Sequence, residues 1–126
     1  MTTHEYQELA IKTEAPYDKA KMMMAGGRQI RLMHGAVGLA TESGELLDTL
    51  KKHVYYQKML DTGNLAEELG DILWYVAIIC SEMGWPMEEI MRMNIDKLRL
   101  RYPNKFTKEN ANVRDLDAEQ GVFKDL

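Results

Sequence analysis

Two segments of the chain combine a helical apolar stripe with a pair of acidic residues three positions apart. The segments read LATESGELLDTLKK and LAEELGDILWYVA, and their acidic pairs are Glu42 with Glu45 and Glu68 with Asp71. At about 100° of rotation per residue, Glu42 falls roughly 40° from Leu46 on the apolar arc of the first segment. Residues three apart are neighbours on a helix surface, so each pair occupies one side of its helix. The chain must therefore fold with carboxylates at the edge of its apolar core.

The remainder of the sequence favours an all-α fold. Only three prolines and nine glycines interrupt the 126 residues, and the alternation of apolar and polar residues that is typical of strands is missing. A chain of this length supports one hydrophobic core, so we expect a single four-helix bundle-like domain, residues 1–126, with its core at about 29–102 and a polar tail at 103–126. The expected helices cover about residues 2–14, 29–56, 64–83 and 86–101, with a short one near 114–119.

Capping signals predict where these helices begin and end. The first helix starts with a capping box at Thr2, and Asn64 with Glu67 has the same spacing at the start of the third. Gly84 is expected to end the third helix, and Pro86 suits the first position of the fourth.

The third expected helix is apolar on almost every side, which predicts that it is buried. A four-helix bundle with such a third helix carries more apolar surface than 126 residues can cover, so we expect the chain to form at least a dimer. Met22, Met23 and Met24 are expected to fill the core or a subunit contact.

Composition excludes several classes of function. The net charge is −4 and the basic residues are dispersed, so no nucleic-acid partner is expected. The longest apolar run, residues 72–80, is far shorter than the roughly 20 residues that span a bilayer, and the N-terminus is polar. The single cysteine, Cys80, excludes an internal disulfide and is expected to be a buried small hydrophobe. We therefore expect a cytoplasmic protein with no membrane partner, in a cell or in an infected host cell.

Four carboxylates on two neighbouring helices would repel one another unless a cation compensated them. Ligands that are all oxygen favour a hard ion, so Glu42, Glu45, Glu68 and Asp71 predict a site for Mg²⁺, for which Mn²⁺ can substitute. A di-iron bundle would instead carry a Glu-x-x-His motif on two helices, and this sequence has none. The plain alternative is that the acids form a solvated helix face and pair with lysines such as Lys51, Lys52 and Lys97.

The same residues resemble a known family. Glu42-Ser-Gly-Glu45, a spacer of 22 residues and Glu68-Leu-Gly-Asp71, followed by NIDKLRLRYPNKFT, are similar to the MazG-like members of the all-α nucleoside triphosphate pyrophosphohydrolase superfamily. The resemblance covers most of residues 30–107. It implies an enzyme that cleaves a nucleoside triphosphate between its α and β phosphates, releasing the monophosphate and pyrophosphate. It also implies that the four acids are catalytic residues and metal ligands, and that the active sites of a dimer or tetramer are lined by more than one subunit.

Further residues are assigned by the same resemblance. Asn94, Lys97, Arg101 and Tyr102 match positions that the family uses around the phosphates. Lys97 and Arg101 lie four apart on one helix face, which is also the pattern of a basic stripe near a helix C-terminus. For the base pocket we consider His34 and Trp74, against the alternatives of a hydrogen-bonded histidine and a core aromatic.

The base and sugar of the substrate stay open, with dGTP, dCTP, dUTP, a damaged nucleotide and an alarmone all considered. The corresponding roles are control of the nucleotide pool, supply of precursors and stress signalling. A non-catalytic helical protein that acts through its oligomeric surface is the alternative from another class.

Overall fold

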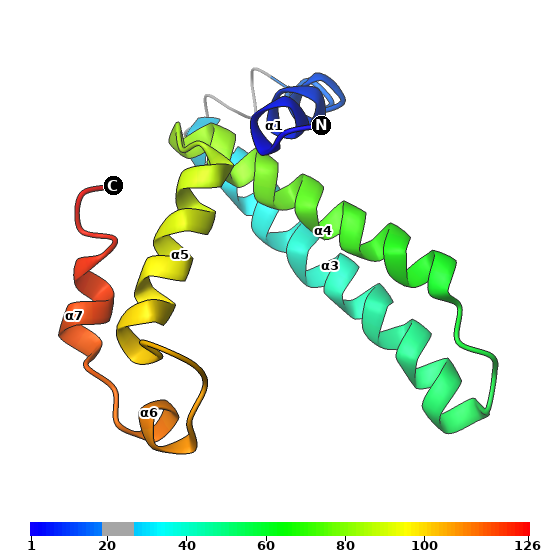
Figure 1. Cartoon of the computed structure of the whole chain (residues 1–126). Coiled ribbons are helices and arrows are strands. Elements are labelled where there is room, and N and C mark those ends of the chain that lie inside the picture. The colour runs from blue at the N-terminus through cyan, green and yellow to red at the C-terminus, as the bar shows by residue number, and fades with distance from the viewer. Residues whose placement is uncertain (19–26) are drawn as a thin grey trace. The chain divides into compact units, whose positions relative to one another are not determined.

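The computed structural model describes residues 1–18 and 27–126, which Figure 1 shows as helices joined by short connections. The predicted all-α class is confirmed, because the described residues form α-helices and no strand. The patch predicted at Met22, Met23 and Met24 lies outside the described residues. The helices are α1 (Thr3–Lys12), α3 (Gly27–Tyr56), α4 (Thr62–Met83), α5 (Met87–Arg101), α6 (Lys108–Asn112) and α7 (Leu116–Gly121).

Two predicted helix ends are confirmed by their hydrogen bonds. At the start of α1, the backbone N–H of Glu5 donates to Thr2 Oγ1 at 3.1 Å, and the N–H of Thr2 donates to Glu5 Oε2 at 2.6 Å. At the end of α4, Gly84 adopts the left-handed conformation with φ of 73°, which glycine tolerates best. In the tail, α7 begins two residues later than predicted, and α6 was not predicted.

The predicted start of the third helix is wrong. α4 begins at Thr62, and its N-cap is Asp61, whose carboxylate accepts a hydrogen bond from the N–H of Asn64 at 2.9 Å. Asp and Asn are about equally good N-caps, and here the aspartate takes the role. Asn64 therefore lies within the first turn, and the capping box predicted with Glu67 does not form. Likewise, Pro86 directly precedes α5 instead of occupying its first position.

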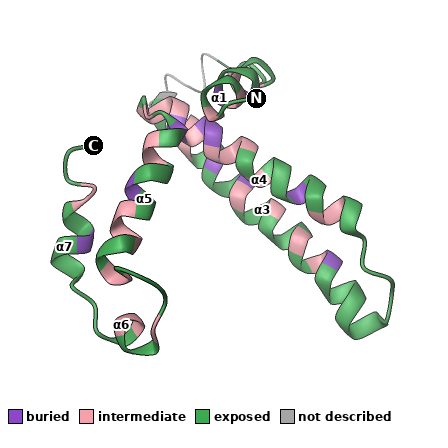
Figure 2. Ribbon diagram, in the orientation of Figure 1, coloured by how far each residue is buried: buried purple, intermediate pink, exposed green. Residues whose placement is uncertain are grey.

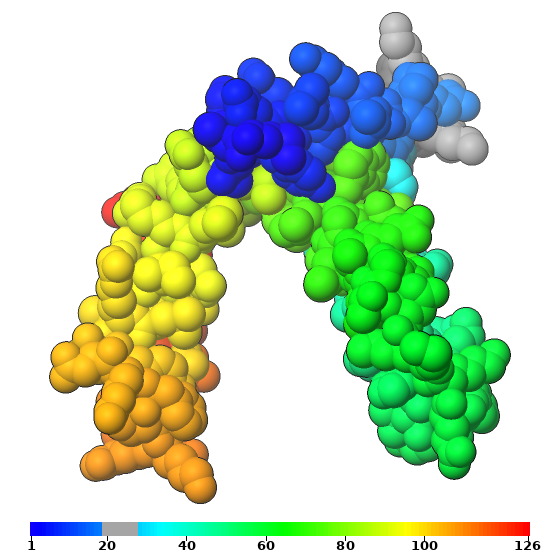
Figure 3. All heavy atoms as spheres, turned by 45° about the vertical axis from the view of Figure 1, so that its right-hand side comes forward, coloured from blue at the N-terminus to red at the C-terminus, as the bar shows by residue number. Residues whose placement is uncertain are grey.

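The described chain divides into two compact units, residues 1–87 and 88–126. In the first unit, α3 and α4 form an antiparallel hairpin and pack side by side (Figure 1). α1 packs against α4 and covers part of it in the space-filling view (Figure 3). The predicted single domain with a core at 29–102 stays a prediction.

Two glycines of α3 allow the close approach of α4. A Cβ atom at Gly38 would lie 2.1 Å from the ring of Tyr75, and one at Gly35 would lie 2.5 Å from the side chain of Ile79. Real Cβ atoms do not come this close to other heavy atoms, so any larger residue would push the two helices apart. The spacing of the hairpin therefore depends on Gly35 and Gly38.

A partly buried ion-pair cluster attaches the segment after α1 to the hairpin. Arg31 of α3 donates to Glu14 at 2.6 Å and to Glu82 at 3.0 Å. Burial alone would raise the pKa of Glu14, but hydrogen bonds from Arg31 and Tyr17 outweigh it and lower that pKa below its usual value. The stability that Glu14 contributes is therefore present above the ordinary pKa of a glutamate and is lost as the pH falls through its lowered pKa.

The core of the first unit is small. Ala77 and Ile78 are fully buried, and the predicted burial of Cys80 is confirmed, with burial raising the pKa of its thiol. The predicted burial of the third helix is wrong for parts of α4 in a single chain, because Leu69 is 52% exposed and Leu73 is 50% exposed. Figure 2 shows that exposed positions predominate along the half of the hairpin nearest the α3–α4 connection. No helix in the described ranges has both the length and the apolar character that a membrane span requires.

We expect Gly38→Ala to destabilise the protein by about 1–3 kcal/mol, because the added methyl group would overlap the ring of Tyr75. Thermal unfolding followed by circular dichroism measures the effect. Gly70→Ala on α4 is the matched control, since its Cβ atom meets no atom within 4 Å and the change favours the helix by about 0.5–1 kcal/mol. Equal melting temperatures for the two variants would contradict the role of Gly38.

Candidate metal centre

Three of the four predicted acids converge between α3 and α4. Glu42 of α3 and Glu68 and Asp71 of α4 each offer one carboxylate oxygen, and these oxygens all lie within 4.8 Å of one another. The close hairpin explains the convergence, because each acid lies beside the stripe of small and apolar residues through which the helices meet. Exposed acids can gather in this way without a metal, so the burial and the hydrogen bonds of the three residues decide what the cluster can do.

The three carboxylates differ in burial, from the interior of the hairpin to its surface. Glu68 is only 5% exposed, Glu42 is half-buried and Asp71 is exposed. Desolvation raises the pKa of Glu42, and the charges of Glu45, Asp71 and Glu68 raise it further, as does a hydrogen bond with Glu68. The cluster therefore holds negative charge that the fold disfavours and that remains open to solvent on one side.

Glu45, the fourth predicted acid, lies outside this group of three. It is exposed, and together with Glu68 it lines a cavity of about 430 Å³ on the hairpin. The other lining residues are Thr41, Gly44, Asp48, Thr49, Lys52 and Asn64. Glu45 is close enough to Glu42 to raise its pKa, so it adds to the negative potential of the cluster.

The donor set fits a hard divalent cation. Three carboxylate oxygens from two rigid helices are ligands that Mg²⁺ and Mn²⁺ prefer, and the exposed side at Asp71 leaves room for water or substrate oxygens. Of the lysines named in the solvated-face alternative, Lys51 and Lys52 both form ion pairs with Asp48, at 2.6 and 2.7 Å.

Three hydrogen bonds around the cluster were not predicted from the sequence. Asn64 Nδ2 donates to Glu68 Oε1 at 2.7 Å, and Thr49 Oγ1 donates to Asn64 Oδ1. On the other side, the hydroxyl of Tyr6 donates to the carbonyl of Gly70 at 3.3 Å, and burial, followed by the charge of Asp71, raises the pKa of Tyr6. The sequence predicts Asn64 as an N-cap and not as a partner of Glu68. Nothing in the sequence of α1 indicates that Tyr6 contacts α4.

The predicted phosphate-binding residues lie in the second unit. Arg101 forms a two-pronged ion pair with Glu119 of α7, with Nε 2.8 Å from Oε1, and Arg114 also donates to Glu119. The two arginines lower the pKa of Glu119 far below its usual range. Lys97 lies 6.0 Å from the centre of the Phe123 ring, Asn94 is exposed, and Tyr102 is half-buried. The structure does not place these residues relative to the acidic cluster, and their role stays a prediction.

The predicted base-pocket residues lie together on the first unit. The rings of His34 and Trp74 meet edge to face, with centroids 6.4 Å apart, and Tyr75 packs against both. His34 Nδ1 lies 2.7 Å from the hydroxyl of Tyr17, and Trp74 Nε1 donates to Thr13 Oγ1 at 2.7 Å. Tyr17 and Thr13 therefore form hydrogen bonds with the two residues. These contacts favour the alternatives of a hydrogen-bonded histidine for His34 and a core aromatic for Trp74.

Comparison with known proteins finds a matching family and a similar phage protein. A family model described as the MazG nucleotide pyrophosphohydrolase domain matches residues 35–106, which is more than half of the chain. The "Gene 37 protein" of Mycobacterium phage L5 is 32% identical over 76 residues, which cover 56% of this chain and 65% of that protein. The chain thus spans slightly less than two thirds of this relative. No solved structure matches the chain.

Glu42→Gln is expected to raise the melting temperature of the metal-free protein. Because the folded-state pKa of Glu42 lies above its unfolded value, wild-type stability should fall as the pH rises through that pKa. We expect the variant to lose less stability than wild type between about pH 5 and about pH 8 in a chelator. Glu67→Gln, a change at an exposed neighbouring acid, is the control. A lower melting temperature for Glu42→Gln would show that this carboxylate is structural.

Proposed function

The chain belongs to the MazG nucleotide pyrophosphohydrolase domain family, and we propose that it hydrolyses a nucleoside triphosphate between the α and β phosphates with the help of Mg²⁺. The observation that carries this proposal is the convergence of Glu42, Glu68 and Asp71 within 4.8 Å at the rim of the α3–α4 hairpin. A structural role would not require three like charges to share so small a space.

The carboxylates of Glu42, Glu68 and Asp71 would hold the cation. A bound divalent ion would polarise the α phosphoryl group, stabilise the pyrophosphate that leaves and lower the pKa of a bound water. A triphosphate carries about four negative charges, so an acidic site binds it only when cations lie between them. The open side at Asp71 is where the phosphate oxygens would approach.

Glu45 is our candidate for the group that accepts the proton of the attacking water. It lies one turn from Glu42 and lines the 430 Å³ cavity together with Glu68, and it is exposed to solvent. A carboxylate next to the ligands but outside their group of three can take a proton without giving up a place in the coordination shell.

Residues of the second unit are our candidates for binding the phosphates. Lys97 and Arg101 are proposed to bind the β and γ phosphates, and Asn94 and Tyr102 to orient phosphate oxygens. Arg101 already donates to Glu119 through Nε and one terminal nitrogen. His34 and Trp74 remain our base-pocket candidates, although the contacts of Tyr17 and Thr13 argue against direct stacking.

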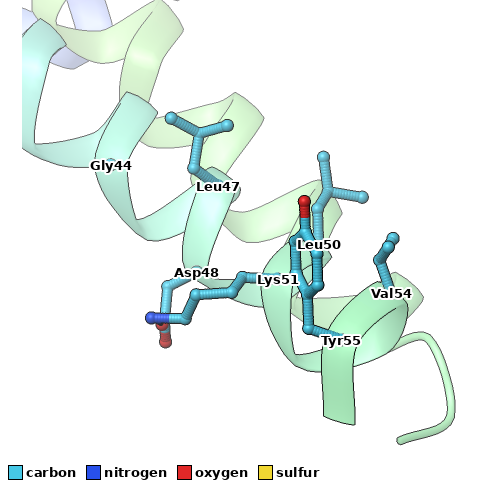
Figure 4. Close-up of a pocket in the computed structure, with 7 residues that line it drawn as sticks. All are labelled: Gly44, Leu47, Asp48, Leu50, Lys51, Val54 and Tyr55. Atoms are coloured by element: carbon cyan, nitrogen blue, oxygen red, sulfur yellow. Dashed lines mark ion pairs between the residues drawn. The ribbon is translucent and has the colours of Figure 1, made fainter. Parts of the chain in front are cut away.

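Self-association belongs to the same proposal. A groove of about 400 Å³ on the outer side of α3, which we call the α3 groove, is lined by Gly44, Leu47, Asp48, Leu50, Lys51, Val54 and Tyr55. Leu47, Leu50 and Val54 project toward the same side of the helix (Figure 4). Exposed leucines and valines in one row favour burial against a second copy. The same groove is the observation that favours the alternative function, a non-catalytic protein that acts through its oligomeric surface.

A panel of nucleoside triphosphates with Mg²⁺ tests the enzymatic proposal. The panel should include dGTP, dCTP, dUTP, a damaged nucleotide and an alarmone, and the readout is pyrophosphate with the matching monophosphate. We expect Asp71→Asn and Glu45→Gln to reduce turnover by roughly a hundredfold or more, because each removes a charge at the metal or the water. Absence of turnover for every nucleotide and every divalent ion would leave the oligomeric alternative.

Light scattering at micromolar concentration tests self-association. We expect wild type to be a dimer or larger, and Val54→Glu to shift it toward monomer, because a charge would be buried in the α3 groove. Val113→Glu, at a position 76% exposed in the second unit, is the matched control. A monomeric wild-type protein would refute the proposed contact.

A further inference from the structure

We propose that Thr49 and Asn64 form a hydrogen-bonded support that fixes the carboxylate of Glu68 in the position where it binds the cation. The inference rests on the proposed function in one respect, namely that Glu68 is a metal ligand. Asn64 and Thr49 would then be positioning residues, which act on the site through Glu68 and do not touch the cation themselves.

The chemistry of the three groups fixes the direction of the hydrogen bonds. A carboxylate only accepts, so the amide of Asn64 must present its NH₂ to Glu68 Oε1, at 2.7 Å. Its oxygen then faces Thr49, whose hydroxyl donates to it. The same hydroxyl also lies 3.2 Å from the carbonyl of Glu45, one turn back on α3. The support therefore runs from α3 through the amide to a carboxylate on α4.

Burial makes this support necessary. Thr49 is 6% exposed and Glu68 is 5% exposed, and a buried carboxylate without a donor is strongly disfavoured. An arginine or lysine would solve the same problem, but its charge would cancel that of Glu68 and compete with a divalent cation. A neutral amide stabilises the ionised carboxylate and leaves its charge available. This combination is what a metal ligand at the buried end of a site needs.

The side chain of Asn64 can be changed without disturbing the N-cap of α4. The carboxylate of Asp61 accepts a hydrogen bond from the backbone N–H of Asn64, which any residue at this position keeps. Asn64→Ala therefore removes only the side-chain amide. Thr49→Val removes only the hydroxyl, because valine has nearly the same shape as threonine.

Affinity for Mn²⁺, measured by calorimetry or electron paramagnetic resonance on the purified full chain, tests the proposal without a substrate. Loss of a residue that orients a ligand weakens metal binding by roughly 10–100-fold, which is what we expect for Asn64→Ala. Thr49→Val should weaken binding less, because the amide still reaches Glu68. The double variant should bind Mn²⁺ no more weakly than Asn64→Ala, because Thr49 acts only through Asn64.

Two control variants match the changes in type. Ser43→Ala removes another hydroxyl of α3, one that donates to the carbonyl of Leu39 one turn back. Glu67→Gln changes an exposed polar side chain beside Glu68. Both should keep the Mn²⁺ affinity of wild type, and the metal-free melting temperature of every variant reports on folding.

Several results would overturn the proposal. One is an unchanged Mn²⁺ affinity for Asn64→Ala, with or without a loss of thermal stability, since that would make the amide purely structural. Another is a wild-type protein that binds no Mn²⁺. If Mn²⁺ binding depends on Asn64 but no nucleotide is hydrolysed, the support stands and the proposed enzymatic function fails.

Discussion

The close contact between α3 and α4 determines where every acidic side chain of the candidate site lies. Gly35 and Gly38 let the two backbones approach, and the rings and branched side chains of α4 fill the space that the glycines leave. One to two turns further along the same seam, Glu42 meets Glu68 and Asp71. The seam therefore brings together like charges that would separate in a looser hairpin, and desolvation, followed by these charges, raises the pKa of Glu42.

Helical periodicity predicts much of this arrangement. Residues three and four apart share a face, so the placement of Glu42, Glu68 and Asp71 beside two apolar stripes indicates that they can meet, and the structure brings them within 4.8 Å. Periodicity does not predict that Glu45 lies outside the group formed by the other three acids. Which side chains meet at the edge of the hairpin depends on the distance and the crossing angle between α3 and α4. That distance comes from glycines, whose role is visible only when the partner helix is known.

Other features depend on choices that local sequence leaves open. Two good N-cap residues lie at the start of the α4 segment, and the selection of Asp61 as the cap leaves the Asn64 side chain for Glu68. The pairing of Arg101 with Glu119 joins residues eighteen positions apart through the tail, which no helical pattern indicates. The predicted burial of the third helix fails at Leu69 and Leu73 within one chain, because a hydrophobic pattern does not state whether its cover comes from the same chain or from a second copy.

The uninterrupted length of α3 has a consequence for how this chain can vary. Its thirty residues extend about 45 Å and carry, in order, the arginine of the ion-pair cluster, the spacing glycines, Glu42 and Thr49. Insertion of one residue between Gly38 and Thr49 would rotate everything beyond it by about 100° and would turn Thr49 away from Asn64. Changes of length are therefore tolerable in the connection at residues 57–61 but not inside α3, because this one helix sets the relative positions of all these residues.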